Sequence, residues 1–295
     1  MDTRENLIGE VKCTMKILIT GVRGFIGSHL AKRLVAEGHE VVGISHSFNA
    51  TPPVEGTKLH YAQLGDTEYM RIIMKENPDA VLHYAAQTGI GNSNENMTYN
   101  IRVNLVGLLH VLDAVALTDA KRLIFPSSGG TVYGNRHLAV ETDPLWPFNP
   151  YGITKVAGEH YIQYYARVHR LKYTILRYAN VYGPGNKRNA VDIFAQRLAA
   201  NQPSLIFGDG SNSKDYVYIE DVVEATVLAL YQEAEGIYNI GTGVETTTLE
   251  LLATMQSLVG TSVSALLCPP RVGDIVFYSL NCEKAKKVLN WKPKT

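Results

Sequence analysis

The stretch MKILITGVRGFIGSHLAKRL (residues 15–34) decides the fold of this chain. Its apolar start, MKILIT, predicts a buried strand, and the periodic segment from Ile26 to Glu37 predicts an amphipathic helix. Between the two, three glycines spaced GxxGxxG permit a tight turn and let backbone amides at the helix start approach a pyrophosphate. This order predicts a dinucleotide-binding loop, with contacts from Gly21, Arg23, Gly24, Phe25, Ile26 and Gly27.

Further apolar runs continue the alternation of strand and helix. Strands are predicted at 40–45, 80–85, 122–127 and 173–178, and helices at 68–77, 101–117 and 151–171. Strands that are apolar throughout are typical of a parallel sheet covered by helices on both faces. The 295-residue chain is therefore predicted to be an α/β protein with a Rossmann-type doubly wound parallel sheet.

After Asn180 the chain changes character. Loops rich in Gly, Asn and Ser follow one another: YGPGNKRN (182–189), GDGSNSKD (208–215) and GTGVETT (241–247). We predict a dinucleotide-binding domain over residues 15–180, with a return segment at about 214–246, and a smaller α/β substrate-binding lobe over 181–213 and 247–295. Residues 1–14 are expected to form a leader ahead of the first strand.

Composition argues against several kinds of partner. The chain has 28 basic and 28 acidic residues and no net charge, so no overall field attracts nucleic acid or an anionic membrane. No apolar run reaches the roughly 18 residues of a membrane span. The three cysteines and nine histidines lack CxxC or HExxH spacing, which predicts a reducing cytoplasmic location and no metal site.

The segment NPYGITKVAGEH (149–160) contains a candidate catalytic pair. Asn149 and Pro150 predict a helix start, which places Tyr151 and Lys155 on one helix face. A cation beside a phenol lowers the phenol pKa from about 10 towards neutrality, which suits a general acid and base. The YxxxK spacing recurs by chance in a chain with 17 tyrosines, but here it comes after a strand that ends in Ser127 and Ser128.

The segment EVVGISHS (40–47) bears on the choice of cofactor. An acid after this strand would hold the ribose 2′-hydroxyl of NAD, and Ser45 stands in its place. Ser45 does not repel a 2′-phosphate, and Arg23 and His46 could meet one. Arg23 is equally well explained as a solvated loop residue, so the residues leave NAD and NADP open.

Ten segments between Met15 and about Thr295 together resemble the extended short-chain dehydrogenase/reductases, specifically the NAD-dependent epimerase/dehydratase group that acts on nucleotide sugars. They include GVRGFIGSHL (21–30), SSGGTVYG (127–134), YGITK (151–155), LRYANVYGPG (176–185) and RVGD (271–274). The resemblance implies an enzyme with bound NAD, and a substrate that is a nucleoside-diphosphate sugar, in this family usually UDP-linked.

The resemblance also implies roles for individual residues. Tyr151 would be the acid and base, Lys155 would bond the nicotinamide ribose, and Asp66 would bond the adenine. The cofactor pocket would further include Leu64, Ala85, Ala86, Gln87 and the supporting Asn104. The substrate would be held by Asn180, Lys214, Arg271 and Asp274. Lys214 stands where the family often has Arg, which replaces a bidentate clamp by a point charge.

The position of the catalytic hydroxyl departs from the family pattern. It usually lies three residues before the valine of VYG, which here is Gly129. Either the loop carries one extra residue and Ser128 takes the role, or Thr131 substitutes. We favour Ser128 because the preceding strand aligns directly with it.

The two residues after that hydroxyl distinguish among the reactions of the family. A 4,6-dehydratase usually has an Asp-Glu pair there, whereas this chain has Gly129 and Gly130. We predict a nucleotide-sugar 4-epimerase that works through a transient 4-keto sugar with bound NAD. The alternative is an NADPH-dependent 4-keto-sugar reductase, and a non-catalytic NAD(P)-binding sensor is a minor one. A homodimer is expected, with an interface on the helices at 101–117 and 151–171 that includes Leu108, Val111, Leu112, Tyr161 and Tyr165.

Overall fold

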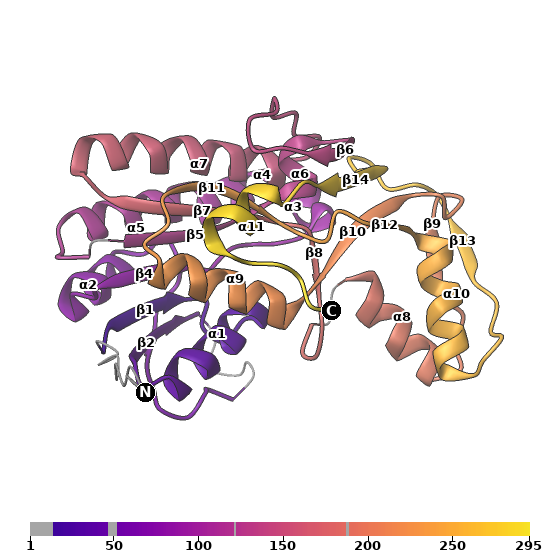
Figure 1. Ribbon diagram of the computed structural model, residues 1–295, viewed down its shortest axis with the longest axis horizontal. Helices are drawn as coiled ribbons and strands as arrows, with labels where there is room; N and C mark the ends of the chain where they lie inside the picture. The colour runs from indigo at the N-terminus through magenta and orange to yellow at the C-terminus, as the bar shows by residue number, and fades with distance from the viewer. Residues whose placement is uncertain (1–13, 47–51, 121, 187–188) are drawn as a thin grey trace, which may run out of the picture.

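The computed structural model describes residues 14–46, 52–120, 122–186 and 189–295 (Figure 1). Residues 1–13 lie outside the described residues. They include Cys13 and all of the expected leader except Thr14. None of the described helices is long and apolar enough to cross a lipid bilayer.

A seven-stranded parallel sheet forms the centre of the larger domain, as predicted. Its strand order is β11-β7-β5-β4-β1-β2-β3, and every neighbouring pair is parallel. The strands are β1 (Lys16–Thr20), β2 (Glu40–Ser45), β3 (Thr57–Tyr61), β4 (Ala80–His83), β5 (Arg122–Ser128), β7 (Lys172–Tyr178) and β11 (Gly236–Ile240). The edge strands β3 and β11 were not predicted, because partial exposure gives them a mixed pattern instead of a continuous apolar run.

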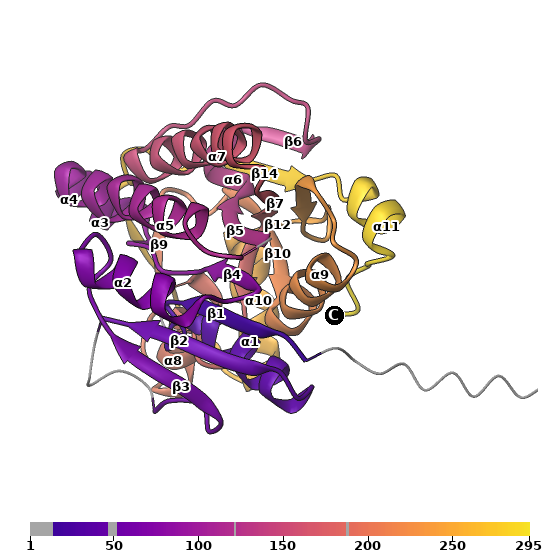
Figure 2. The same cartoon turned by 90° about the vertical axis from the view of Figure 1, so that its left-hand side faces the viewer.

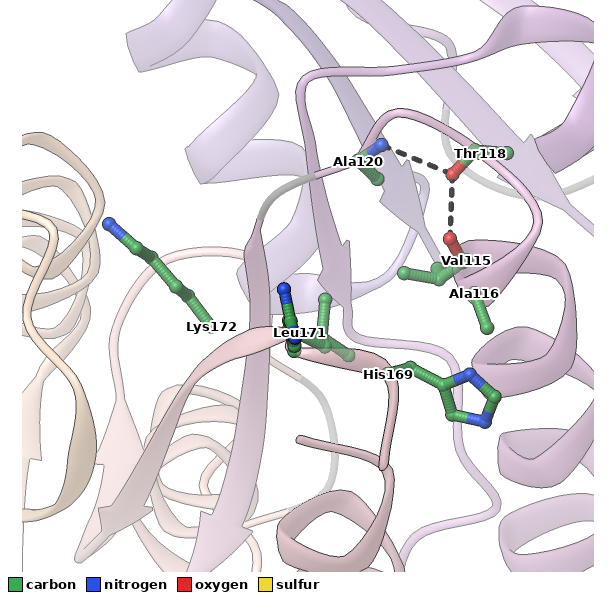
Figure 3. Close-up of a pocket in the computed structure, with 8 residues that line it drawn as sticks. Val115, Ala116, Thr118, Ala120, His169, Leu171 and Lys172 are labelled. Carbon is green, nitrogen blue, oxygen red and sulfur yellow. Dashed lines mark hydrogen bonds between the residues drawn. The ribbon is translucent and has the colours of Figure 1, made fainter. Parts of the chain in front are cut away.

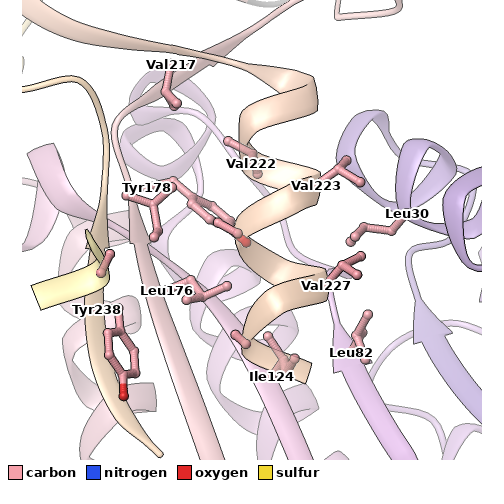
Figure 4. Packing of buried hydrophobic residues seen from close by; sticks show 14 of the residues in the cluster. Leu30, Leu82, Ile124, Leu176, Tyr178, Val217, Val222, Val223, Val227 and Tyr238 are labelled. Carbon is pink, nitrogen blue, oxygen red and sulfur yellow. The ribbon is translucent and has the colours of Figure 1, made fainter. Parts of the chain in front are cut away.

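Both faces of this sheet are buried, as the apolar strands require. Successive β1 side chains enter different cores: Ile17 and Ile19 pack on one side, and Leu18 packs on the other. Helices α1 (Phe25–Ala36) and α9 (Ile219–Tyr231) cover the first face, and α2 (Thr67–Glu76), α5 (Gly107–Ala116) and α7 (Pro150–His169) cover the second. Figure 4 shows Val222, Val223 and Val227 of α9 packed between the strands and Leu30 of α1.

The predicted helix at 101–117 contains a π-helical turn. It consists of α4 (Met97–Ile101), a π-helical turn η1 (Arg102–Val106) and α5. A π turn inserts an extra residue into the helix and is frequent at functional sites. The insertion turns the Asn104 side chain inward, where only 5% of it is exposed.

The smaller lobe is built on a second sheet, and the first 180 residues also contribute a strand to this sheet. Its order is β12-β10-β14-β6, and β8 also pairs with β10. The strands are β6 (Arg136–Ala139), β8 (Asn180–Tyr182), β10 (Ser213–Tyr218), β12 (Glu245–Thr247) and β14 (Phe277–Leu280). A separate pair, β9 (Leu205–Phe207) and β13 (Leu266–Cys268), packs with α8 (Ala190–Ala199) and α10 (Thr248–Val259) at the far end of the lobe (Figure 1).

The end of the chain packs against elements of the larger sheet and its covering helices. Helix α11 (Glu283–Leu289) contacts α9 and β11, and Figure 2 shows it beside α9. Trp291, 1% exposed, donates a hydrogen bond from Nε1 to the Asp221 carbonyl oxygen at 2.9 Å. We therefore propose that the substrate lobe ends after Leu280.

Candidate active site

The glycine loop lies between β1 and α1, and two of its glycines have no room for a Cβ atom. Gly21 has φ +66°, and a Cβ there would lie 2.8 Å from the Ala85 amide nitrogen. A Cβ on Gly27 would lie 2.4 Å from the Gly21 carbonyl oxygen. Gly24 is the N-cap of α1 and offers no side chain to its first amides, so these amides are available to an anion. The loop therefore fits the pyrophosphate of a dinucleotide.

Arg23 is buried beside the end of β2. Only 9% of it is exposed, and its Nη1 donates to the Tyr61 hydroxyl at 3.3 Å. Tyr61 is the register partner of Ser45, which is itself 5% exposed, whereas His46 is exposed. The interpretation of Arg23 as a solvated loop residue is therefore wrong. The Arg23 guanidinium lies where the second strand ends, on the side expected to receive the adenosine ribose.

The loop after β4 is held by Asn104. Its Oδ1 accepts from the Gln87 amide at 2.8 Å, and its Nδ2 donates to the Gln87 carbonyl oxygen at 2.9 Å. Ala85 in the same loop donates from its amide to Thr20 Oγ1 at 3.0 Å, and Ala86 is half-buried beside it. Asn104 therefore holds the backbone of the loop after β4, which is part of the predicted cofactor pocket.

Two further predicted cofactor residues precede α2. Leu64 is buried against α5, where a Cβ on Gly107 would lie 2.5 Å from Leu64 Cγ. Asp66 is the N-cap of α2, but its side chain makes no capping hydrogen bond. Its exposed carboxylate is therefore not used to cap the helix.

Sequence reasoning missed Asn100 and Thr154. Asn100 donates from Nδ2 to Gln87 Oε1 at 2.9 Å, and Thr154 donates from Oγ1 to Asn100 Oδ1 at 3.2 Å. These bonds connect the loop after β4 to α7. No local pattern marks them, because the partners are far apart in the sequence.

The predicted catalytic residues converge at the end of β5. Tyr151 lies in the first turn of α7, and Ser128 is the last residue of β5. Lys155 is 4% exposed, donates from Nζ to the Pro126 carbonyl oxygen at 2.7 Å, and lies 4.4 Å above the Phe125 ring centroid. The same Nζ is 5.7 Å from the centroid of the Tyr151 ring.

The electrostatics of this pair differ from the expectation. Burial raises the pKa of Tyr151 to about 12 and lowers the pKa of Lys155 to about 7, although Glu159 partly stabilises the ammonium. The predicted lowering of the Tyr151 pKa is absent, because Lys155 is itself desolvated and its ammonium is bonded to a backbone carbonyl. Burial therefore favours the neutral form of both side chains.

Ser128 and Thr131 occupy different environments. Ser128 is half-buried at the strand end, and no hydrogen bond of its hydroxyl is found among the described residues. Thr131 lies in α6 (Gly129–Tyr133), and its Oγ1 is fully buried with no hydrogen-bond partner in the described part of the chain. A substrate oxygen could reach the Ser128 hydroxyl far more readily.

A pair of variants tests this assignment. Ser128→Ala is expected to lower kcat by about 10²-fold, the usual cost of losing a hydrogen-bond donor to the reacting oxygen. Thr131→Val keeps the shape of the side chain and removes a hydroxyl without a partner, so kcat should be unchanged. Steady-state rates on a nucleotide sugar measure both, and the reverse ranking would assign the role to Thr131.

The predicted substrate residues lie on the lobe side. Asn180 begins β8 and accepts from the Tyr278 hydroxyl at 3.0 Å. Lys214 Nζ is buried without a hydrogen bond and lies 3.8 Å from Asp274 Oδ1, and burial lowers the Lys214 pKa. The Arg271 guanidinium is exposed and stacks 3.6 Å from the Phe207 ring centroid. Lys214 and Arg271 are therefore cations with unused donors suited to a diphosphate.

A hollow of about 200 Å³ lies at the opposite edge of the sheet (Figure 3). Its lining includes Leu171 and Lys172, where β7 begins, whereas Ser128 lies at the carboxyl end of the parallel strand β5. It is therefore separate from the catalytic pair. Among the described residues, no group of three or more His, Cys, Asp or Glu could hold a metal ion.

Comparisons with known proteins show the family of the chain. The model of the NAD dependent epimerase/dehydratase family matches residues 17–241. The chain is 36% identical over 288 residues to a putative UDP-glucose 4-epimerase of Methanocaldococcus jannaschii, covering 94% of this chain and 93% of that protein. It is also 36% identical over 296 residues to a UDP-glucose 4-epimerase of Mycolicibacterium smegmatis, covering 95% and 94%.

A solved structure extends the similarity to three dimensions. The UDP-glucose 4-epimerase of Thermus thermophilus in complex with NAD has a TM-score of 0.91 and 36% identity to this chain, covering 95% of this chain and 94% of that one. Sequence and structure are thus similar over nearly the whole length. The chain therefore belongs to the NAD dependent epimerase/dehydratase family.

Proposed function

We propose that this protein is an NAD-dependent nucleotide-sugar 4-epimerase. The observation that carries the proposal is the bond from Lys155 to the Pro126 carbonyl oxygen, which sets the helix that bears Tyr151 beside the strand that ends in Ser128. The same sheet also carries the glycine loop. The named relatives that match along nearly the whole chain are UDP-glucose 4-epimerases, and one of them is solved with NAD.

The chain's own residues account for the proton chemistry. Bound NAD would supply reversible hydride transfer at C4 of the sugar. Tyr151 would take the proton of the C4 hydroxyl and give it back, and Ser128 would hydrogen-bond the same oxygen. Because Tyr151 has a raised pKa, a charged Lys155 close to the ring is needed to favour its deprotonated form.

We further propose a UDP-hexose as substrate. Lys214 and Arg271 supply positive charge, and Asp274 supplies an acceptor for the nucleoside hydroxyls. The names of the relatives favour UDP-glucose, whose 4-epimer is UDP-galactose, and the geometry of these three residues does not distinguish among hexoses.

Two measurements test the function together. Freshly purified protein is denatured and the released nucleotide is identified by mass spectrometry, and a second sample is incubated with UDP-glucose and analysed for UDP-galactose. We expect near-stoichiometric NAD and interconversion without net cofactor consumption. Consumption of NADPH with a 4-keto sugar would replace the epimerase by the reductase, and bound nucleotide without turnover of any UDP-sugar would favour the sensor.

A homodimer through α4, η1 and α7 extends the proposal. Several large apolar side chains of these helices are exposed: Ile101, Val106, Ile153, Tyr161, Tyr164 and Val168. Leu108, Val111 and Leu112, which we expected in the interface, are instead fully buried within the subunit, and Tyr165 is half-buried and bonded to Asp113. Sedimentation should show a dimer that Val168→Asp weakens, and a wild-type monomer would contradict it.

A cytoplasmic location remains our prediction. The two described cysteines, Cys268 and Cys282, form no disulfide, which suits a reducing compartment. Recovery of the protein in a secreted fraction of the native host would contradict it.

A further inference from the structure

The turn Arg271–Asp274 connects the two parts of the candidate site. Within the turn, the Asp274 amide donates a hydrogen bond to the Arg271 carbonyl oxygen at 3.3 Å, and Gly273 has φ +76°. On the lobe side, Arg271 stacks on Phe207 and Asp274 faces Lys214. The other side of the turn faces the dinucleotide-binding domain, where two asparagines bond its backbone.

These two asparagines come from different helices. Asn94 of α3 (Ile90–Glu95) donates from Nδ2 to the Val272 carbonyl oxygen at 2.9 Å. Asn149, the N-cap of α7, donates from Nδ2 to the Gly273 carbonyl oxygen at 3.1 Å. Packing is close as well, since a Cβ on Gly273 would lie 3.1 Å from the Phe148 carbonyl oxygen and 3.4 Å from Asn149 Cβ.

Asn149 uses both ends of its amide at once. Its Oδ1 accepts from the Gly152 amide at 2.9 Å, which caps the helix that carries Tyr151 and Lys155. A backbone amide can only donate and a carbonyl can only accept, so these two partners define the orientation of the side-chain amide. Only 1% of Asn149 is exposed, so water cannot readily replace either bond.

The geometry points to Asn149 as a positioning residue that couples the substrate turn to the catalytic helix. This inference rests on the proposed function, in which Arg271 and Asp274 hold the nucleotide part of the substrate. Asn149 bonds the backbone of that turn, and in the sequence it lies two residues before Tyr151. The groups that would hold the nucleotide and the group that would act on the sugar are thereby placed relative to one another before substrate arrives.

Asn149→Ser separates the two duties of the side chain. Serine remains a good N-cap, so its hydroxyl still accepts from Gly152, but it is too short to reach Gly273. Losing one hydrogen bond of ordinary strength should loosen the turn by roughly 5- to 10-fold. Asn94→Ser is the companion variant, because it removes the other tether of the turn at an exposed position and leaves the cap of α7 intact.

The test combines kinetics with hydrogen–deuterium exchange on the full chain. For both variants we expect KM for UDP-glucose to rise about 5- to 10-fold with kcat within twofold, and exchange to accelerate within residues 271–274 but not in α7. NAD content and melting temperature should match those of the wild type. Unchanged exchange in the turn would overturn the inference, and so would faster exchange throughout α7 with a lower melting temperature, because the cap alone would then explain Asn149.

The two hypotheses fail in different ways. If the wild type converts no UDP-sugar, the proposed function fails, yet exchange of the turn still decides whether Asn149 tethers it. If the wild type is active and both variants keep the wild-type KM and exchange, the coupling fails and the proposed function stands.

Discussion

Tyr151→Phe is expected to lower kcat by about 10²- to 10⁴-fold, the contribution usual for a positioned acid and base. The change removes one hydroxyl from the first turn of α7 and keeps the ring beside Lys155. No hydrogen bond of the Tyr151 hydroxyl is found among the described residues, so its loss leaves no protein partner unsatisfied. The melting temperature and the NAD content should therefore stay at wild-type values.

Rates of UDP-glucose to UDP-galactose conversion measure this effect. Tyr173→Phe is the matched control, because Tyr173 lies near the start of β7 at the opposite edge of the sheet, and it should keep the full rate. A Tyr151→Phe variant with wild-type kcat would remove Tyr151 from the mechanism.

Glu159→Gln is expected to lower the free energy of unfolding by about 3–5 kcal/mol, the usual cost of breaking a buried ion pair from one side. Arg177 donates to both Glu159 oxygens, from Nε at 3.0 Å and from Nη2 at 2.6 Å. The two side chains are 3% and 1% exposed. Although burial opposes the charged form, the hydrogen bonds that Arg177 donates to Glu159 raise the pKa of Arg177. The variant would therefore leave a buried guanidinium without its counter-charge.

The same carboxylate belongs to a wider network. Glu159 Oε1 also accepts from Ser127 Oγ at 2.5 Å, and Arg177 donates from Nη1 to the Tyr133 hydroxyl at 2.6 Å. Tyr133 in turn donates to Asn239 Oδ1 at 2.9 Å. The network ties α7 to β5, β7, α6 and β11, so its loss should weaken the strand ends that carry Ser128.

Urea unfolding at pH 7 measures this prediction. Glu40→Gln is the control, because Glu40 pairs with Lys16 at 3.3 Å and is 51% exposed, and it should change the stability by less than about 1 kcal/mol. Equal, small effects of the two variants would show that the buried pair contributes little to stability.

The secondary structure and the general type of site could be predicted from local patterns. Apolar runs identified the five central strands because both faces of the sheet are buried, and the glycine spacing identified the loop because no Cβ fits at Gly21 or Gly27. The π turn at Arg102–Val106 was missed, because one inserted residue leaves the local hydrophobic pattern helical. Our proposal that the smaller lobe ends after Leu280 depends on the packing of Trp291 on α9, a contact that no local pattern reveals.

By itself, the sequence determined the α/β fold, the dinucleotide loop and the candidate pair Tyr151 and Lys155, because each depends on neighbours within a few residues. Only the tertiary structure decided that Arg23 is buried against Tyr61, that burial raises the Tyr151 pKa and lowers the Lys155 pKa, and that Asn149 bonds Gly273. Desolvation and long-range hydrogen bonds depend on which distant segments meet. The local periodicity of a sequence carries no information about such tertiary contacts.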